Sequence, residues 1–251
     1  MNRFNSKLLP YGKNLLNRLL RPLNLKIDRI NVENDFGHLI SKTLSCHGCD
    51  LLIDVGANEG QYAKTIITNG YNGDIISFEP LFMAHRKLEN TARRYNNWSV
   101  ESPIAIGSVK SDTIINVSSN SVSSSLLEME KAHTDAEKKS KYVDTQHTTV
   151  VPLDFYTEKF AGYKNLYVKI DTQGYEMEVL TGLRGLLTRI SFIQLEVSFV
   201  ELYTGQFLHQ SIEDWMDENG FKLWSVDRGF TDHCSGQTYQ ADIIYKKTTH
   251  V

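Results

Sequence analysis

Four acidic residues of the sequence lie near or just after the end of an apolar run, where a bound ligand could be reached, and the first is followed by glycines. Asp54 lies near the end of the run 51–55 and is followed by Gly56, Asn58 and Gly60. Glycine lets the backbone turn tightly and approach a ligand without a Cβ in the way. A helix that begins after such a turn presents unpaired N–H groups to that ligand. The pattern therefore predicts a small-molecule site after the first strand.

The residues around this turn indicate what charge the ligand carries. Dinucleotide sites prefer a second glycine where this chain has Asn58, because that glycine makes room for a pyrophosphate. A carboxylate at Asp54 would repel a pyrophosphate, and it suits a ligand with an ammonium and a sulfonium group, such as S-adenosylmethionine (SAM). Asp54 is therefore a candidate contact for the charged end of such a ligand.

A second acid, Glu79, follows the apolar run 74–78. An acid at this place can accept hydrogen bonds from both ribose hydroxyls of an adenosine. NAD and SAM share that adenosine, so Glu79 indicates an adenosine cofactor without naming the reaction. The run 104–107 leaves the next predicted strand where the adenine would lie, which makes Ile106 a candidate adenine contact.

Two further acids, Asp171 and Glu196, end or follow later strand candidates, at 165–171 and 191–198. Open α/β sheets bind their ligands at the carboxyl ends of their strands, so these two side chains are expected to converge near the reacting group. Either could serve as general base, and together they could provide oxygen ligands for Mg²⁺. His233, between the last two strand candidates, is a third candidate base.

Strand-like and helix-like segments alternate along the chain at the spacing of βαβ units, which predicts a parallel sheet covered by helices on both faces. The predicted strands are 51–55, 74–78, 100–106, 165–171 and 191–198, and the predicted helices are 61–69, 81–95, 175–187 and 211–219. Two final strand candidates, 221–226 and 239–245, are joined without a helix, so they are expected to form an antiparallel hairpin. This combination is unlike most dinucleotide dehydrogenases. It matches the α/β class I methyltransferase (Rossmann-like) fold, a doubly wound seven-stranded sheet with an antiparallel last strand.

The sequence resembles the FkbM family of SAM-dependent methyltransferases over roughly residues 50–247. The resemblance lies in the runs IDVGANEGQY, FEP, KIDTQGYEMEVL, LEVSFVELYTGQ and ADIIYKK. It implies methyl transfer to a hydroxyl, usually of a sugar, glycan or polyketide, with Asp171 at the methyl-transfer centre. The cofactor-binding positions it implies, together with those above, are Asp54, Gly56, Asn58, Gly60, Gln61, Glu79, Ile106 and Asp171. Many relatives have Glu where this chain has Gln173, so a base or metal role does not carry over to that position.

The reaction expected from these features is SAM-dependent O-methylation of a sugar, a glycan or a related small molecule. Two alternatives remain open from the sequence: an NAD-dependent oxidoreductase, and a non-catalytic protein that binds an adenosine ligand. The base candidates are Asp171, Glu196 and His233, and Asp171 with Glu196 would hold Mg²⁺ if a metal takes part. A nucleic-acid partner is not expected, because the body of the chain is acidic and lacks a basic stripe interleaved with aromatics.

The charge of the chain is uneven, which suggests a division into two parts. Six basic and no acidic residues fall in residues 1–27, whereas the whole chain has net charge −3. We expect a basic helical leader over 1–45 and a methyltransferase domain over 46–251, with an irregular insert or lid at 107–150. Within that insert, 128–141 is a charged helix candidate. The leader fits either peripheral contact with an anionic membrane face or packing on its own domain. Three cysteines, an odd number, and no apolar run of membrane-spanning length point to a cytoplasmic protein.

Overall fold

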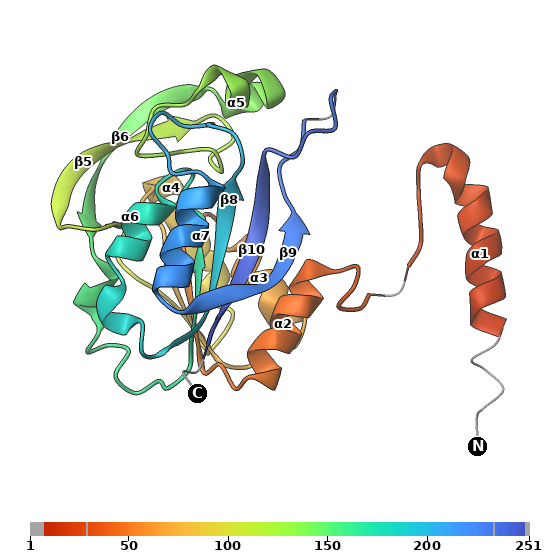
Figure 1. Cartoon of the computed structure of the whole chain (residues 1–251), viewed down its shortest axis with the longest axis horizontal. Coiled ribbons are helices and arrows are strands. Elements are labelled where there is room, and N and C mark those ends of the chain that lie inside the picture. Colours follow the sequence, from red (N-terminus) through yellow and green to blue (C-terminus); the bar gives the residue numbers. More distant parts are fainter. Residues whose placement is uncertain (1–7, 29, 233, 249–251) are drawn as a thin grey trace.

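The computed structural model describes residues 8–28, 30–232 and 234–248. A seven-stranded sheet forms the centre of the molecule, in the order β3-β2-β1-β7-β8-β10-β9 (Figure 1). Its strands are β1 (Leu51–Val55), β2 (Asp74–Phe78), β3 (Trp98–Val100), β7 (Leu166–Ile170), β8 (Ile190–Ser198), β9 (Phe221–Arg228) and β10 (Gln240–Lys247). β10 runs antiparallel to both of its neighbours, β8 and β9, while β3, β2, β1, β7 and β8 pair in parallel. The doubly wound class I methyltransferase sheet expected from the sequence is confirmed.

Strand register places the functional positions at one edge of this sheet. Val55 is paired with Phe78 on one side and with Ile170 on the other, and Ile170 is paired in turn with Leu195. The side chains of β1 and β7 are buried at every position, as continuous apolar strands covered on both faces must be. Residues that follow these strands therefore meet at their shared carboxyl edge.

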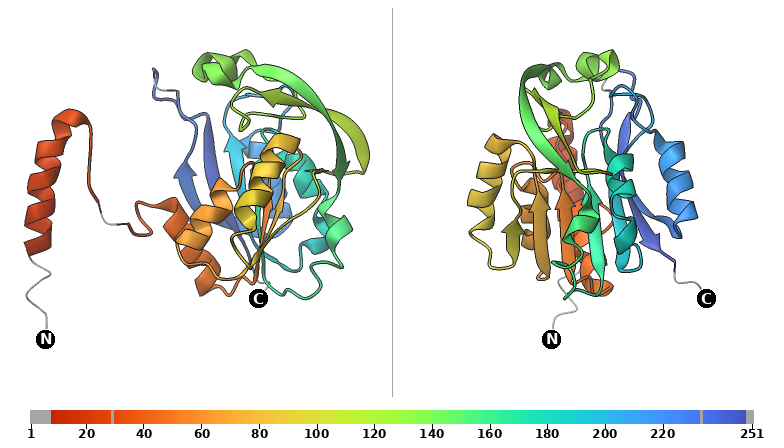
Figure 2. Two further views of the ribbon diagram at one scale, coloured as in Figure 1. Left: turned by 180° about the vertical axis from the view of Figure 1, so that it is seen from behind. Right: turned by 90° about the vertical axis from the view of Figure 1, so that its left-hand side faces the viewer.

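Helices cover both faces of the sheet (Figure 2). The helices α2 (Phe36–Cys46), α3 (Gln61–Thr68) and α4 (Phe82–Ala92) pack their apolar residues into one core cluster. On the opposite face, α6 (Glu176–Thr181) and α7 (His209–Glu218) contribute to the other main cluster. The predicted helix 175–187 is shorter than expected: α6 ends at Thr181, and the 3₁₀ helix η4 (Arg184–Leu186) follows Gly182. A Cβ at Gly182 would lie 1.9 Å from the Gly107 carbonyl oxygen, so the chain must turn there on a glycine.

The insert 107–150 is ordered as a β-hairpin, and the expectation of an irregular segment was wrong. Strands β5 (Ser111–Ser118) and β6 (Tyr142–Val151) pair antiparallel, and β4 (Ala105–Ile106) joins β6 to complete a three-stranded sheet. The charged segment 128–141 contains only α5 (Lys131–Ala136) and the 3₁₀ helix η2 (Lys138–Ser140). The predicted strand 100–106 is also divided, since β3 ends at Val100 and β4 begins at Ala105. Pro103 lies between them and has no N–H to donate to a ladder.

The two parts of the expected leader differ in their packing. α1 (Leu8–Leu20) and the 3₁₀ helix η1 (Arg21–Leu23) stand away from the body (Figure 1). α2 begins after Asp35, whose carboxylate accepts a hydrogen bond from the His38 N–H as an N-cap, and it buries Ile40 and Leu44 in the core. The packed domain therefore begins before residue 46, at about α2. Among the described residues, no helix combines the length and apolarity needed to span a bilayer.

Candidate active site

The turn after β1 is packed directly against the end of β7. Gly56 has a φ of 74°, and a Cβ there would lie 1.9 Å from the Asp171 carbonyl oxygen. The Asp171 N–H donates to the Val55 carbonyl at 3.1 Å. Gly60, with a φ of 88°, lies so close to the Trp98 ring that a Cβ would be 2.6 Å from it. A side chain at either glycine would clash with these neighbours. The close contact at Gly56 allows Asp171 to lie beside the glycine turn.

Asp54 lies beneath this turn and is fully buried. Its Oδ1 is 3.3 Å from the Lys169 ammonium, and its Oδ2 accepts a hydrogen bond from the Ser77 hydroxyl at 3.4 Å. Lys169 is also 3.4 Å from an Asp171 oxygen and donates to the Gly56 carbonyl at 3.0 Å. Burial opposes the charge of Lys169, but the Asp171 and Asp54 carboxylates raise its pKa above the usual value. Of the two carboxylates that contact Lys169, only that of Asp171 is exposed, with a side-chain exposure of 37% against 0% for Asp54.

Glu79 is held in place by two backbone N–H groups. Its Oε2 accepts from the Asn58 N–H at 2.8 Å and its Oε1 from the Leu81 N–H at 2.9 Å. Burial raises the pKa of Glu79 to about 7, although these two hydrogen bonds favour its charged form. Glu79 thus connects the end of β2 to the glycine turn, as expected for one cofactor site built from both. The side chain of Ile106 is buried in the core, whereas Gln61 is exposed at the start of α3.

Asp171 and Glu196 converge, and Gln173 joins them. The Gln173 amide nitrogen donates to Asp171 Oδ1 at 2.8 Å and to Glu196 Oε2 at 2.7 Å, while its Oε1 accepts from the Tyr203 hydroxyl at 2.7 Å. Gln240 donates a second hydrogen bond to Glu196 Oε2 at 2.7 Å. Among the described residues, none donates a hydrogen bond to the other oxygen, Oε1. The two acids lie together, as the sequence predicts, but sequence reasoning missed Gln240, which lies on a distant part of the chain.

Burial raises the pKa of Glu196 well above its usual value, and the nearby Asp171, Asp242 and Glu176 carboxylates raise it further. Glu196 is therefore a carboxyl group that takes up a proton more readily than an exposed glutamate does. In its ionised form such a group is a stronger base than an exposed glutamate, which suits it to accept a proton from a bound hydroxyl.

Two cavities meet at Asp171, which lines both. The first has a volume of about 300 Å³ and lies between α2, α3 and the ends of β7, β8 and β10; Gln61, Tyr62 and Lys169 are among its lining residues. The second has a volume of about 280 Å³ and lies under the insert. It is lined by Asn120, Val122, Ser123, His133, Glu137, Asp171, Gln173, Glu196, Phe230 and Gln240. We call the first the α3-side cavity and the second the insert-side cavity.

The insert closes over the glycine turn. Ser121, with a φ of 59°, places its hydroxyl 3.4 Å from the Asn58 side-chain nitrogen. On β6, the Gln146 side chain accepts from the Phe82 N–H at 2.9 Å and donates to the Pro80 carbonyl at 2.7 Å, which fixes the hairpin to the start of α4. The insert therefore forms the roof of the insert-side cavity.

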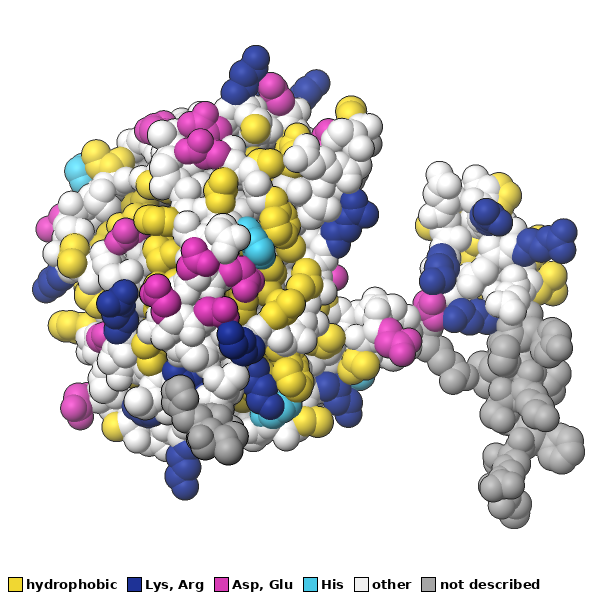
Figure 3. Space-filling view, in the orientation of Figure 1, with side chains coloured by type: hydrophobic (Ala, Val, Ile, Leu, Met, Phe, Trp, Pro, Cys, Tyr) yellow, Lys and Arg dark blue, Asp and Glu magenta, His cyan; other side chains and the backbone are white. Residues whose placement is uncertain are grey.

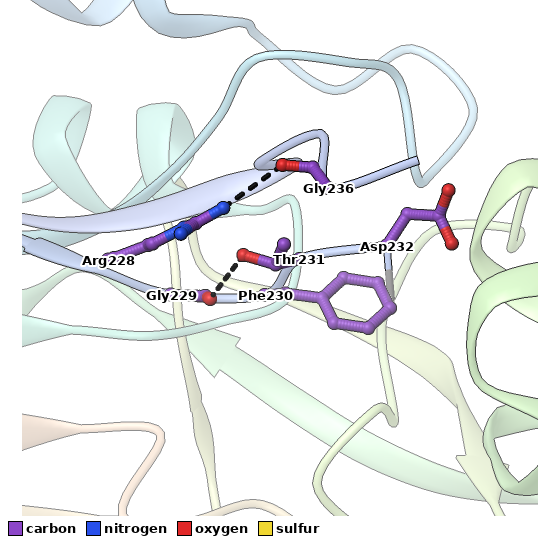
Figure 4. Close-up of a pocket in the computed structure, with 6 residues that line it drawn as sticks. All are labelled: Arg228, Gly229, Phe230, Thr231, Asp232 and Gly236. Carbon is purple, nitrogen blue, oxygen red and sulfur yellow. Dashed lines mark hydrogen bonds between the residues drawn. The ribbon is translucent and has the colours of Figure 1, made fainter. Parts of the chain in front are cut away.

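The β9–β10 loop forms a neighbouring open pocket of about 540 Å³ (Figure 4). Its lining residues are Arg228, Gly229, Phe230, Thr231, Asp232 and Gly236. Arg228 is tied back by hydrogen bonds to the Gly236 carbonyl at 3.0 Å and to the Thr238 hydroxyl at 3.1 Å. Phe230 lines this pocket and the insert-side cavity, so the two adjoin. His233, the third candidate base, lies outside the described residues.

Residues 54–223 match the sequence family described as the methyltransferase FkbM domain, which spans more than half of the chain. The chain belongs to the FkbM methyltransferase family. It is a SAM-dependent methyltransferase, which confirms the resemblance seen in the sequence and removes the NAD-dependent oxidoreductase as an alternative. Comparison with curated proteins finds no match.

The solved structures similar to this FkbM protein include other methyltransferases. One is magnesium protoporphyrin IX methyltransferase from Synechocystis with bound SAM, at 13% identity and a TM-score of 0.45, covering 98% of this chain and 93% of that chain. Another is the methyltransferase domain of a bacterial CtHen1, at 11% identity and a TM-score of 0.46, covering 87% and 100%. These likenesses are weak, and the family assignment rests on the sequence match.

The donor set of this FkbM domain fits SAM. Asp171 offers a half-exposed carboxylate, Gly56 and Asn58 are partly exposed at the turn, and Glu79 lies at the end of β2. The sequence pattern predicts that Asp54 contacts the charged end of the ligand, but its side chain lies beneath the glycine turn. It is fully buried, and its Oδ1 has no hydrogen-bond partner among the described residues although Lys169 is close by.

Mg²⁺ does not fit between Asp171 and Glu196, contrary to the expectation that they could hold it. The Gln173 amide nitrogen already bridges their oxygens with two N–H donors, and an N–H group cannot ligate a cation. Lys169 neutralises the second Asp171 oxygen. In the described part of the chain, no group of three or more His, Cys, Asp or Glu side chains is arranged for a metal.

Proposed function

We propose that this FkbM methyltransferase transfers the methyl group of SAM to a hydroxyl of a sugar, a glycan or a related small molecule. The observation that carries the proposal is the insert-side cavity beside Asp171. Its lining combines side chains that bond hydroxyls, such as Asn120, Ser123 and Gln240, with the Phe230 ring, which can contact the apolar face of a sugar ring. At about 280 Å³ it suits one such ring better than a protein segment or a nucleic acid.

The cofactor would lie against the glycine turn, Glu79 and Asp171, and the acceptor on the insert side of Asp171. Gln61, a cofactor-binding candidate from the sequence, lines the α3-side cavity, and Asp171 lines both that cavity and the insert-side cavity. SAM, when bound, supplies a methyl group on a positively charged sulfur. The Asp171 carboxylate would orient this charged group, and fixing the two reactants in this way is worth several kcal/mol of the barrier.

Glu196 is the residue we propose as general base. Two amide donors hold its Oε2, so Oε1 is oriented and free to accept the acceptor's hydroxyl proton. As that proton passes to Oε1, the hydroxyl oxygen would form its bond to the methyl carbon. The bond between that carbon and the sulfur would break, and the sulfur would keep the electron pair as a neutral thioether. A base in this position contributes about 10²–10⁴-fold to the rate.

Two measurements test the proposal. Calorimetric titration should detect binding of SAM and not of NAD. Incubation with methyl-labelled SAM and a lysate of the source organism, followed by fractionation, should then label glycan or a small hydroxylated compound. Label found only in protein or nucleic acid would contradict the acceptor class. Binding of SAM with no methyl transfer to any fraction would instead favour a non-catalytic adenosine-binding protein.

The Asp171→Asn variant tests whether methyl transfer takes place beside Asp171. It keeps the shape and the hydrogen bond from Gln173 but removes the charge, so turnover should be abolished. Thr145→Ala, at an exposed side chain of β6, is a matched control that should retain turnover. Full activity of Asp171→Asn would disprove the assignment.

A further inference from the structure

The helix α1 carries an apolar face that nothing in the described part of the chain covers. Leu15, Leu16 and Leu19 are 64%, 44% and 67% exposed. At 100° per residue these three leucines lie on one side of the helix, with Lys13 and Asn17 on the other. Leaving so much apolar side chain in water is unfavourable, so this face is expected to have a partner.

The opposite, polar side of α1 contacts residues 27 and 28, which fold back against it. The Asn17 side chain makes two hydrogen bonds with the Ile27 backbone, at 2.9 and 2.7 Å. Asp28 forms ion pairs with both Lys13 and Lys26. Residues 8–28 therefore form one small unit, which we call the docking segment, and its leucine face is the side left open.

The positive charge of the docking segment indicates that its partner is anionic. Residues 1–27 contain six basic residues and no acid. Arg18 borders the leucine face and Arg21 follows directly after α1, in η1. Neither makes an ion pair with any described residue. Figure 3 shows basic and hydrophobic side chains together on the described part of α1. An apolar face bordered by basic side chains is the arrangement of helices that lie in the plane of an anionic lipid surface.

Two other surfaces that could cover the leucines, the exposed apolar patch on β9 and a second copy of α1, carry the wrong charge. On the body, β9 exposes Leu223, Trp224 and Val226, but Lys222, Lys246 and Lys247 surround that patch. A second copy of α1 would bring the same basic residues. Both contacts would place positive charge against positive charge, whereas an anionic bilayer would not.

From these observations we propose that the docking segment binds this methyltransferase to the surface of an anionic lipid bilayer. The leucine face enters the boundary between headgroups and acyl chains, and Arg18 and Arg21 contact the headgroups. β9 lies on the side of the body that faces α1 (Figure 1), so its exposed patch and the lysines of β9 and β10 that surround it would approach the same surface. The inference does not depend on which hydroxyl is methylated.

The test is co-sedimentation of the full chain with vesicles. Vesicles that contain phosphatidylglycerol should bind the protein, pure phosphatidylcholine vesicles should bind it much more weakly, and added salt should reduce binding. In Arg18→Glu with Arg21→Glu, the partition coefficient should fall by at least about 25-fold, since each basic residue near the surface contributes about fivefold. Leu15→Glu with Leu19→Glu should also abolish binding. SAM affinity should be unchanged in both, because α1 lies outside the cofactor site.

Matched variants keep the test falsifiable. Lys138→Glu with Lys139→Glu changes the net charge equally at exposed positions of η2, and Val143→Glu replaces an exposed apolar residue of β6. Neither should reduce vesicle binding. An equal loss in these controls, or equal binding to the two kinds of vesicle, would overturn the proposal. So would a dimer in analytical ultracentrifugation that Leu15→Glu with Leu19→Glu converts to a monomer, because a second copy would then cover the leucines.

Discussion

At the scale of single residues, the site depends on how Glu196 is held. Its Oε2 accepts two amide N–H groups, from Gln173 and Gln240, and its pKa lies well above the usual value because of burial and the neighbouring carboxylates. A base must be ionised to accept a proton. The catalytic rate should therefore rise with pH through the pKa of Glu196.

The Glu196→Gln variant tests this role. Its side-chain oxygen can still accept from Gln173 and Gln240, so the fold should be kept while the base is lost. We expect kcat to fall by about 10²–10⁴-fold, with SAM affinity little changed. A plot of kcat/KM against pH should lose its rising limb. Normal kcat with an unchanged pH profile would show that another group takes the proton.

The position of Gln173 between two carboxylates gives a physical reason for this chain to have Gln where many relatives have Glu. Its amide separates two carboxylates, and the Gln173→Glu variant would place a third carboxylate between them. We expect a loss of about 1–3 kcal/mol in the free energy of unfolding at pH 8, since a half-buried hydrogen-bonded site is broken. The loss should shrink at pH 5, where the new carboxyl can be protonated and donate. Urea unfolding at both pH values measures it, and an equal loss at both would contradict the explanation.

The sequence was sufficient to locate Asp54, Glu79, Asp171 and Glu196 at one sheet edge, because each lies near or just after the end of a strand of a recognisable βαβ pattern. It could not show that Asp54 is covered while Asp171 is exposed, since that depends on Lys169 packing between them. His133 was missed as well. It lies in α5, is buried against the Tyr203 and Phe230 rings, and lines the insert-side cavity, but an isolated histidine in a charged segment gives no local signal.

At the scale of elements, the insert is where sequence and structure differ most. The strands β5 and β6 pair with each other across more than twenty residues, so their stability comes from partners that are distant in sequence. The charged residues between them suggested a long helix over 128–141, and only α5 and η2 form. The main sheet was predictable because its strands and helices follow one another regularly. The insert lacks that regularity.

The Gln146→Ala variant tests how the insert is fixed. It removes the hydrogen bonds to the Pro80 carbonyl and the Phe82 N–H, which join β6 to the start of α4. The free energy of opening the hairpin should fall by about 1–2 kcal/mol. Amide hydrogen exchange should then be faster in β5 and β6 and unchanged in β1. Thr145→Ala on the same strand is the control, and faster exchange there as well would show that the effect is not due to Gln146.

At the scale of the whole molecule, the stability of the fold depends on pH through its buried acids. Burial raises the pKa values of both Glu79 and Glu176 to about 7. In the unfolded chain each has an ordinary value of about 4.3. Between these values the folded protein keeps protons that the unfolded chain has released. The stabilisation is therefore complete below about pH 4.3 and is lost as the pH rises through about 7.

The Glu176→Gln variant isolates one of these groups. Its side-chain oxygen can still accept from the Thr172 and Gly174 N–H groups, but it no longer titrates. Between pH 5 and pH 8 the wild-type free energy of unfolding should fall by roughly 1–3 kcal/mol more than that of the variant. His133, whose pKa burial lowers, acts in the opposite direction in both proteins, so the comparison with the variant cancels it. Urea unfolding across this pH range measures the difference, with Glu218→Gln, an exposed position of α7, as control. Parallel curves for wild type and Glu176→Gln would mean that Glu176 is not a source of the pH dependence.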